Sequence, residues 1–235
     1  MLSGIETAHK VCEQNGLVIC DESWTRLEEY VSLLLEWNSR INLISRKDVD
    51  NIWISHILHS LSPLVAFEFR AGWKILDIGS GGGLPGIPIA IARPDLNLHL
   101  IDSIGKKTMA TSEMIRQIGI TNVSVLTGRV EELGNRDGFK NRFDGVLARG
   151  VAPLVELLRW SRPILKCGLS SGRFELNCHL IPPFVLAMKG GDLTAELVDA
   201  GEASNNKPNI QIKDLELVGS ENFGLEGKKF VIVNF

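Results

Sequence analysis

The spacing of apolar side chains along the chain changes near residue 70. Within residues 21–42, the i, i+3, i+4 and i+7 positions of an amphipathic helix hold Leu27, Tyr30, Val31, Leu34 and Leu35. Asp21 or Ser23 is expected to cap the start of this helix. A second apolar stretch, 52–67, should stop as a helix near Pro63, because proline lacks the backbone N–H that an inner turn needs. Residues 1–70 are therefore predicted to be helical.

From Trp73 onward, short runs typical of β-strands alternate with helix-length segments. The runs span residues 73–78, 97–102, 122–127, 143–148, 184–188, 210–218 and 229–235. Strands that alternate with helices imply a mostly parallel sheet with helices on both faces. Only a turn-like segment separates the last two runs, which predicts an antiparallel hairpin. The sequence thus predicts an α/β fold, with a helical extension over 1–70 and a main domain over 71–235.

Composition is that of an ordinary globular protein. The 235 residues are 44% apolar and 23% charged. No apolar run approaches the roughly 20 residues of a membrane-spanning helix, and the polar N-terminus does not resemble a signal peptide, so we expect a cytoplasmic protein without a membrane partner. The net charge of −3 excludes a generally basic surface but allows a local basic face. Paired cysteine spacing is absent, so we expect no metal site and reduced thiols at Cys12, Cys20, Cys167 and Cys178.

A glycine-rich segment, LDIGSGGGLPGIPIAIARP at 76–94, directly follows the first β-type run. Gly81, Gly83 and Gly86 match the G-x-G-x-x-G pattern of dinucleotide-binding loops, and Asp102 ends the next run about 20 residues on. In a chain with 23 glycines, this pattern alone has low specificity. The simpler alternative is a tight turn that lets a helix pack on a strand.

Charges and prolines around this loop favour a cofactor without phosphates. Asp77 would place a carboxylate beside the loop, where it would repel a pyrophosphate. Pro85 and Pro88 remove N–H donors that a phosphate would use at the start of the next helix. Lys74 is the only basic residue in 74–92. S-adenosylmethionine, which carries a cationic sulfonium, two ribose hydroxyls and an adenine, fits these features better.

Seven separate segments resemble the glucose-inhibited division protein B family. They are EWNSRINLIS, HILHSL, LDIGSGGGLPGIPIAI, LIDSIGKK, GRVEEL, FDGVLARGVAPL and LAMKGGDL, and they run in the family's order from about residue 30 to 193. The family consists of bacterial methyltransferases that modify guanine N7 in small-subunit ribosomal RNA. The resemblance therefore implies a class I S-adenosylmethionine-dependent methyltransferase fold, Rossmann-like and seven-stranded, with an N-terminal helical extension. It also implies an enzyme whose partner is this RNA or a ribosomal particle, and we expect the enzyme to be a monomer.

The resemblance also implies roles for individual residues. It places cofactor contacts at Gly79, Leu84, Val130, Glu131 and Arg149, and Asp102 matches the family's acidic residue at the end of the second strand. Asp77 and Gly81 of the loop complete the predicted cofactor site. Around the acceptor, the candidate catalytic residues are Asn42, His56, Arg129, Arg149 and Lys189.

Two of these residues have a strong physical rationale. Arg149 should lie at the carboxyl end of a strand, where open α/β sheets bind ligands. Its guanidinium could grip the cofactor's carboxylate or an RNA phosphate with two parallel hydrogen bonds. Asp102 could hold the ribose hydroxyls, cap the helix predicted over 106–119, or do both.

The other candidates keep structural alternatives. Glu131 could neutralise Arg129, and Lys189 could be a solvated surface charge. His56 could be satisfied within helix packing, and Asn42 could cap a turn. These alternatives stay open at the level of the sequence.

The chain also departs from the family pattern. His59 stands where the family usually has an aspartate, and Ser55 where an arginine is common, which changes the electrostatics around His56. Residues 167–183, CGLSSGRFELNCHLIPP, are typical of an inserted exposed loop, to which we assign no function.

The implied chemistry needs no general base. Guanine N7 is an exposed lone pair that can attack a methyl group without losing a proton, so alignment is the main requirement. N7 of a paired base lies in the deep groove of A-form RNA, so the target must be unpaired or extruded. Alternatives are a small-molecule or protein acceptor, an NAD-dependent dehydrogenase using the G-x-G-x-x-G loop, and a non-enzymatic RNA-binding protein.

Overall fold

A seven-stranded sheet forms the centre of the computed structural model, which describes residues 3–167, 180–202, 208–220 and 224–235. The strand order is β3–β2–β1–β4–β5–β7–β6. The first five strands are parallel, and β7 runs antiparallel to both β5 and β6. The strands are β1 (Lys74–Ile78), β2 (Asn97–Asp102), β3 (Val123–Thr127), β4 (Gly145–Arg149), β5 (Phe184–Gly190), β6 (Asn209–Asp214) and β7 (Lys228–Asn234). The predicted mostly parallel α/β fold with a terminal hairpin is confirmed.

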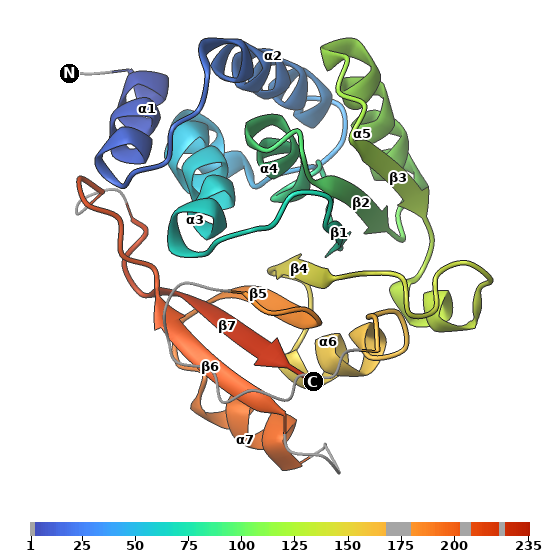
Figure 1. Cartoon of the computed structure of the whole chain (residues 1–235). Coiled ribbons are helices and arrows are strands. Elements are labelled where there is room, and N and C mark those ends of the chain that lie inside the picture. The colour runs from blue at the N-terminus through green and yellow to red at the C-terminus, as the bar shows by residue number, and fades with distance from the viewer. Residues whose placement is uncertain (1–2, 168–179, 203–207, 221–223) are drawn as a thin grey trace.

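Helices cover both faces of the sheet (Figure 1). One face carries α1 (Gly4–Gln14), α2 (Asp21–Asn38), the 3-10 helix η1 (Arg46–Asn51), the π-helical η2 (Trp53–Leu58), α3 (His59–Ala66), α4 (Gly86–Ala92) and α5 (Gly105–Ile118). The other carries the 3-10 helix η3 (Val130–Asn135), α6 (Leu154–Ser161) and α7 (Thr194–Glu202). The helices expected before residue 70 and over 106–119 are therefore present.

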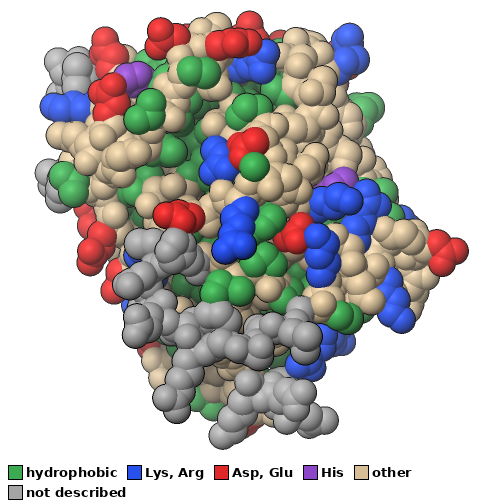
Figure 2. Space-filling model, viewed as in Figure 1, with side chains coloured by type: hydrophobic (Ala, Val, Ile, Leu, Met, Phe, Trp, Pro, Cys, Tyr) green, Lys and Arg blue, Asp and Glu red, His purple; other side chains and the backbone are tan. Residues whose placement is uncertain are grey.

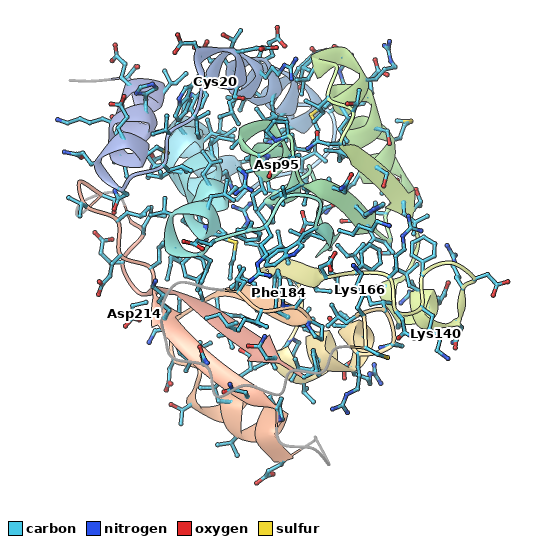
Figure 3. All side chains as sticks on the ribbon, viewed as in Figure 1. Cys20, Asp95, Lys140, Lys166, Phe184 and Asp214 are labelled. Atoms are coloured by element: carbon cyan, nitrogen blue, oxygen red, sulfur yellow. The ribbon has the colours of Figure 1, made fainter. Side chains whose placement is uncertain are left out.

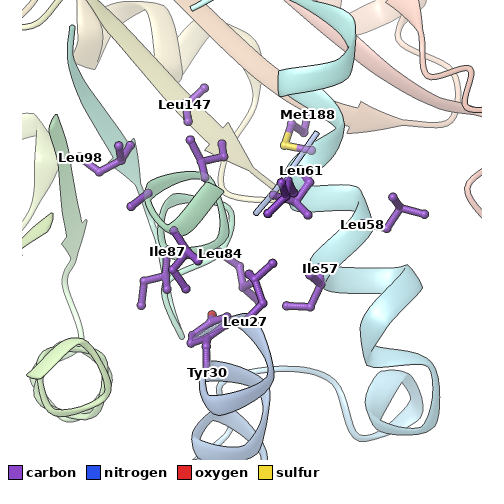
Figure 4. Packing of buried hydrophobic residues seen from close by; sticks show 14 of the residues in the cluster. Leu27, Tyr30, Ile57, Leu58, Leu61, Leu84, Ile87, Leu98, Leu147 and Met188 are labelled. Carbon is purple, nitrogen blue, oxygen red and sulfur yellow. The ribbon is translucent and has the colours of Figure 1, made fainter. Parts of the chain in front are cut away.

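The apolar stripe of α2 packs directly against the glycine-rich segment and α4. Leu27 and Tyr30 are fully buried and belong to the same apolar cluster as Leu84, Ile87 and Ile57 (Figure 4). Helical spacing places these side chains on one face of α2, and their burial removes that face from water. The N-terminal helices therefore share one core with the sheet.

The start of α2 differs from the sequence-based expectation. The helix begins at Asp21, but Cys20 occupies the N-cap position and no side chain caps the helix. The hydroxyl of Ser23 instead donates to the backbone oxygen of Ile91 in α4, at 2.9 Å. The predicted cap at Asp21 or Ser23 is wrong, because Ser23 is buried against a helix that is distant in sequence.

Two further boundaries were wrong. Helix α3 runs through Pro63 to Ala66, because the Ser62 hydroxyl donates to the carbonyl oxygen of His59 (2.7 Å). That oxygen is the acceptor left free by the missing N–H of Pro63. Strand β6 ends at Asp214 rather than at residue 218, since its pairing with β7 stops there.

Charged side chains are unevenly distributed over the surface. In the view shared by Figures 2 and 3, Lys and Arg side chains gather on the side where Lys140 and Lys166 lie. Lys166 is paired with Asp144 at 2.6 Å. A local basic face thus coexists with the net charge of −3.

Several further observations concern the described part of the chain. No helix within it is long and apolar enough to cross a membrane. It contains no group of three or more His, Cys, Asp or Glu side chains that could hold a metal ion. Cys12, Cys20 and Cys167 are free thiols, whereas Cys178 and most of the predicted inserted loop, 168–179, lie outside the described residues.

Candidate active site

The glycine-rich segment forms the turn between β1 and α4. Gly79, Gly81 and Gly83 have φ angles of +66°, +56° and +99°, in the left-handed region that favours glycine. A Cβ at Gly82 would lie only 2.7 Å from Cδ1 of Leu34 on α2. The glycines therefore serve two purposes: they shape the turn, and they let a neighbouring helix approach its backbone.

Hydrogen bonds hold this loop from three elements. The Tyr30 hydroxyl of α2 donates to the oxygen of Gly82 (3.0 Å), and the Thr111 hydroxyl of α5 donates to the oxygen of Gly81 (2.9 Å). The N–H of Gly81 in turn donates to Oδ2 of Asp102 at the end of β2 (3.0 Å). Helix α2 of the N-terminal part thus contributes to the position of the loop.

A cavity of about 390 Å³ opens at the carboxyl ends of β1, β2 and β4. Strand order reverses between β1 and β4, and open α/β sheets bind ligands at such points. The predicted residues that line the cavity are Gly79, Asp102, Arg129, Val130 and Glu131. Sequence reasoning missed other lining residues, among them Ile104, Gly150, Val151 and Trp160.

Asp102 joins the glycine loop to the turn that precedes α5. Its Oδ1 accepts the N–H of Ile104 (2.8 Å), while its Oδ2 accepts the N–H of Gly81. Helix α5 begins at Gly105 with Ile104 in the N-cap position, so Asp102 is not its N-cap. Each carboxylate oxygen can accept more than one hydrogen bond, so the carboxylate can still accept from hydroxyls of a ligand.

Asp77 lies beneath the loop rather than in the cavity wall. Its carboxyl group is fully buried, and Oδ2 accepts the N–H of Gly86 at the start of α4 (2.9 Å). Burial raises the pKa of Asp77 to about 7, against the opposing effects of the Gly86 hydrogen bond and the Arg149 charge. Leu84 is also buried, in the core shared with α2. Neither side chain lines the cavity, so any contribution to binding is exerted through the loop.

Arg129 and Glu131 form a partly exposed ion pair at the cavity. Nη1 of Arg129 lies 3.3 Å from Oε1 of Glu131, and the side chains are 69% and 39% exposed. Exposed pairs of this kind contribute little to stability, so both groups can rearrange around a ligand.

Arg149, the last residue of β4, contacts the N-terminal helices. Its Nη2 donates to Nδ1 of His56 in the π-helical η2 (3.0 Å). Burial, and secondarily the charge of Arg149, lower the pKa of His56 to about 4, so the ring is neutral at pH 7 and accepts at Nδ1. The hydrogen on Nε2 then faces Oδ2 of Asp48, but at 3.6 Å the two are too far apart for a hydrogen bond.

His59, which departs from the aspartate expected at this position, is also buried, and the charge of Arg149 acts on it. Its pKa is lowered to about 3, first by burial and then by the charge of Arg149, so it is neutral at pH 7. The guanidinium of Arg149 therefore lacks the negative charge that an aspartate would bring at this position. Ser55 is half-buried and carries no charge.

The remaining two candidates lie apart from the cavity wall. Asn42 is exposed, and its side chain has no hydrogen-bond partner within the described residues. Lys189, near the end of β5, donates to the oxygen of Ala152 and pairs with Glu196 of α7, both at 2.6 Å. Lys189 is therefore not a solvated surface charge. The sequence carried no signal for Glu196, whose partners lie 42 and 7 residues away along the chain.

Comparison with known proteins identifies close relatives. The family model for rRNA small subunit methyltransferase G (GidB) matches residues 23–172. The ribosomal RNA small subunit methyltransferase G of Christiangramia forsetii is 38% identical over 181 residues, which are 77% of this chain and 79% of that protein. The protein of the same name from Chlorobium limicola is 36% identical over 231 residues, 97% and 96% of the two chains.

Solved structures share the fold at low sequence identity. A SAM dependent methyltransferase from Aquifex aeolicus has a TM-score of 0.50 at 14% identity, covering 86% of this chain and 97% of that one. A mutant of MtNAS in complex with S-adenosylmethionine has a TM-score of 0.54 at 14% identity, covering 90% and 76%. These likenesses show the class I methyltransferase fold.

Proposed function

The chain belongs to the rRNA small subunit methyltransferase G family and is an S-adenosylmethionine-dependent methyltransferase; from this premise we propose that it methylates N7 of one guanine in small-subunit ribosomal RNA. The cavity at the carboxyl ends of β1, β2 and β4 is the observation that carries the proposal. Its volume falls within the roughly 300–1,000 Å³ of small-molecule sites.

The cavity fits the chemistry of the cofactor. Asp102 offers carboxylate oxygens to ribose hydroxyls, and Ile104 and Val130 offer apolar contact to an adenine. Arg129, the one basic side chain among the described lining residues, is paired with Glu131, so no phosphate cradle is present there. When bound, S-adenosylmethionine supplies an electrophilic methyl group on its sulfonium.

The residue roles follow from these positions. Asp102 orients the ribose, and Gly79 keeps the loop backbone close to the cofactor. Arg149, aimed by His56, places a positive charge beside the site for the cofactor's carboxylate or an RNA phosphate. The exposed Asn42 is left for contacts with the acceptor RNA, and Arg129 can join it because its exposed pair with Glu131 can rearrange.

The site contains no free acid–base pair among its described residues. Asp102 already accepts two N–H groups, Glu131 is paired with Arg129, and His56 is neutral and engaged by Arg149. This arrangement suits an acceptor that has no proton to lose. Alignment of the N7 lone pair with the methyl group then supplies much of the acceleration.

The proposal also covers the conformation of the target guanine, the RNA partner, and the oligomeric state and location of the enzyme. The guanine is unpaired or extruded, because N7 of a paired base is inaccessible in A-form RNA. The partner is small-subunit RNA, either naked or in a ribosomal particle. The enzyme acts as a cytoplasmic monomer, with residues 1–70 as a helical extension of a methyltransferase domain over 71–235.

Methyl mapping tests this function. The full chain is incubated with S-adenosylmethionine and small ribosomal subunits, or naked RNA, from cells that lack the protein. The product, a cationic 7-methylguanine, is open to mild reduction and strand scission, so one new cleavage site at a guanine is expected. RNA treated with an Asp102→Ala variant serves as the control. No new cleavage, with S-adenosylmethionine binding intact, would reject the acceptor and leave the cofactor assignment standing.

Experiments on the same protein also distinguish the alternative functions that the sequence allows. A small-molecule or protein acceptor would leave the RNA unmodified while S-adenosylmethionine still binds. Calorimetric titration with NAD tests the dehydrogenase, which the family assignment already disfavours. Binding of RNA without either cofactor would indicate a non-enzymatic protein.

A further inference from the structure

A mostly buried ion pair joins the end of β5 to α7. Nζ of Lys189 lies 2.6 Å from Oε1 of Glu196, and their side chains are only 13% and 24% exposed. Removal of one partner from such a pair leaves an uncompensated charge with little access to water. The pair is therefore better placed to hold a local structure than an exposed pair would be.

Both members of the pair also bind the loop between β4 and α6. Oε1 of Glu196 accepts the N–H of Leu154, the first residue of α6, and Nζ of Lys189 donates to the oxygen of Ala152 (2.6 Å). No side chain within α6 or at its N-cap, Pro153, caps this helix. The Glu196 carboxylate supplies the missing acceptor, and its charge is favourable at the positive end of a helix.

The loop that they hold forms part of the cavity wall. Gly150 and Val151 line the cavity, and they directly follow Arg149. Val151 also packs against the glycine-rich turn, since a Cβ at Gly79 would lie 2.8 Å from its two Cγ atoms. A chain of contacts thus leads from α7 through this loop to the cofactor cavity.

We propose that Glu196 is a positioning residue which, with Lys189, holds the β4–α6 loop (residues 150–153) and the first residue of α6 in the conformation that completes the cofactor cavity. Lys189 acts in this scheme through the oxygen of Ala152 and through Glu196. It does not contact the acceptor RNA, because its ammonium group is already directed into the protein by both contacts. The inference concerns cofactor binding and therefore does not depend on the identity of the acceptor.

The two possible roles of Lys189 make opposite predictions for Glu196. If Lys189 positions the loop, removal of Glu196 weakens S-adenosylmethionine binding. If Lys189 binds RNA directly, removal of Glu196 frees the ammonium group, so RNA affinity stays unchanged or increases while cofactor affinity is unaffected.

Calorimetry on the full chain distinguishes them, with Glu196→Ala and Glu196→Gln as test variants. Glu196→Ala is expected to raise the Kd for S-adenosylmethionine by about tenfold, since the N–H of Leu154 loses its carboxylate acceptor and Lys189 keeps only the oxygen of Ala152 as a partner. Glu196→Gln should recover part of this loss, because its amide oxygen still accepts from Leu154. Asp199→Ala is the matched control, since Asp199 is exposed on the same helix and has no hydrogen bond or ion pair within the described residues. Hydrogen exchange should show faster exchange over 150–154 in Glu196→Ala but not in Asp199→Ala.

Circular dichroism establishes that each variant is folded at the temperature of titration. If Glu196→Ala does not fold, the proposal is tested with Glu196→Gln alone. A folded Glu196 variant with unchanged cofactor affinity and unchanged exchange over 150–154 would overturn the proposal. So would a Lys189→Met variant that loses RNA affinity but binds S-adenosylmethionine normally. Failure of the RNA mapping experiment would leave these binding results intact, so the two proposals fail separately.

Discussion

Replacement of Asp102 by alanine removes a carboxylate that joins two loops at the cofactor cavity. In the structure its oxygens accept the N–H groups of Gly81 (3.0 Å) and Ile104 (2.8 Å). Loss of a charged acceptor for the ribose hydroxyls is expected to cost about 1.5–3 kcal/mol of binding free energy, or about 10- to 150-fold in Kd. The two freed N–H groups should also lower the free energy of unfolding by about 1–3 kcal/mol.

The Thr111→Val variant shows whether Asp102 affects cofactor binding by direct contact with the ribose or only by stabilising the glycine-rich loop. Thr111 is fully buried and donates to the oxygen of Gly81, but it does not line the cavity. The Thr111→Val substitution should therefore destabilise the loop but change the Kd for S-adenosylmethionine by less than about threefold. This change is well below the one expected for the loss of a hydrogen bond to a charged group. Calorimetric titration with S-adenosylmethionine and urea unfolding of both variants supply the comparison. Equal losses of affinity in Thr111→Val and Asp102→Ala, or none in Asp102→Ala, would refute the contact with ribose.

Four shorter predictions complete the tests. Gly79→Val should abolish cofactor binding and also lower Tm, because position 79 has φ of +66° and lies against the β4–α6 loop; wild-type affinity in titration would contradict this placement. As pH falls from 6.5 through about 4, the free energy of unfolding measured in urea titrations should decrease, since His56 and His59 have folded pKa values of about 4 and 3, below their unfolded values. Asp77, with a folded pKa of about 7, has the opposite effect. A free energy of unfolding that stays constant or increases as pH falls would show that the two histidines do not outweigh Asp77. Arg149→Lys should slow single-turnover methyl transfer nearly as much as Arg149→Ala, because a lysine keeps the charge but loses the planar fork; near-normal rates in Arg149→Lys would show that charge alone suffices. The wild-type rate should vary by less than about threefold between pH 6 and 8, whereas a tenfold rise per unit would reveal a general base.

Local patterns were sufficient to predict most of the fold. Alternating β-type runs and helix-length segments determine a mostly parallel sheet, because each parallel connection needs a crossover. The amphipathic spacing of α2 identified Leu27 and Tyr30 as buried, as they are. Helix and strand ends were less predictable: α3 passes Pro63 because a neighbouring hydroxyl replaces the lost donor, a compensation that no periodicity reveals.

The strand-end rule also located part of the site. Residues at or just after the ends of β1, β2 and β3 converge at one edge of the sheet, so the sequence by itself brings Gly79, Asp102 and Arg129 towards one cavity. The glycine loop was identified from its composition, and the family resemblance supplied the cofactor and the acceptor. These inferences depend on order along the chain, which sequence records directly.

Tertiary structure alone decided the partners of Arg149 and Lys189, whereas the pairing of Arg129 with Glu131 was already considered from the sequence. Arg149 points at His56, 93 residues earlier, and Lys189 is held by Glu196 and by Ala152. Such pairings depend on which helix covers which strand end, and on the burial that leaves His56 neutral. Sequence determines which charges the chain carries and near which strand ends they fall. Packing determines which of them are paired, and hence which remain available to a ligand.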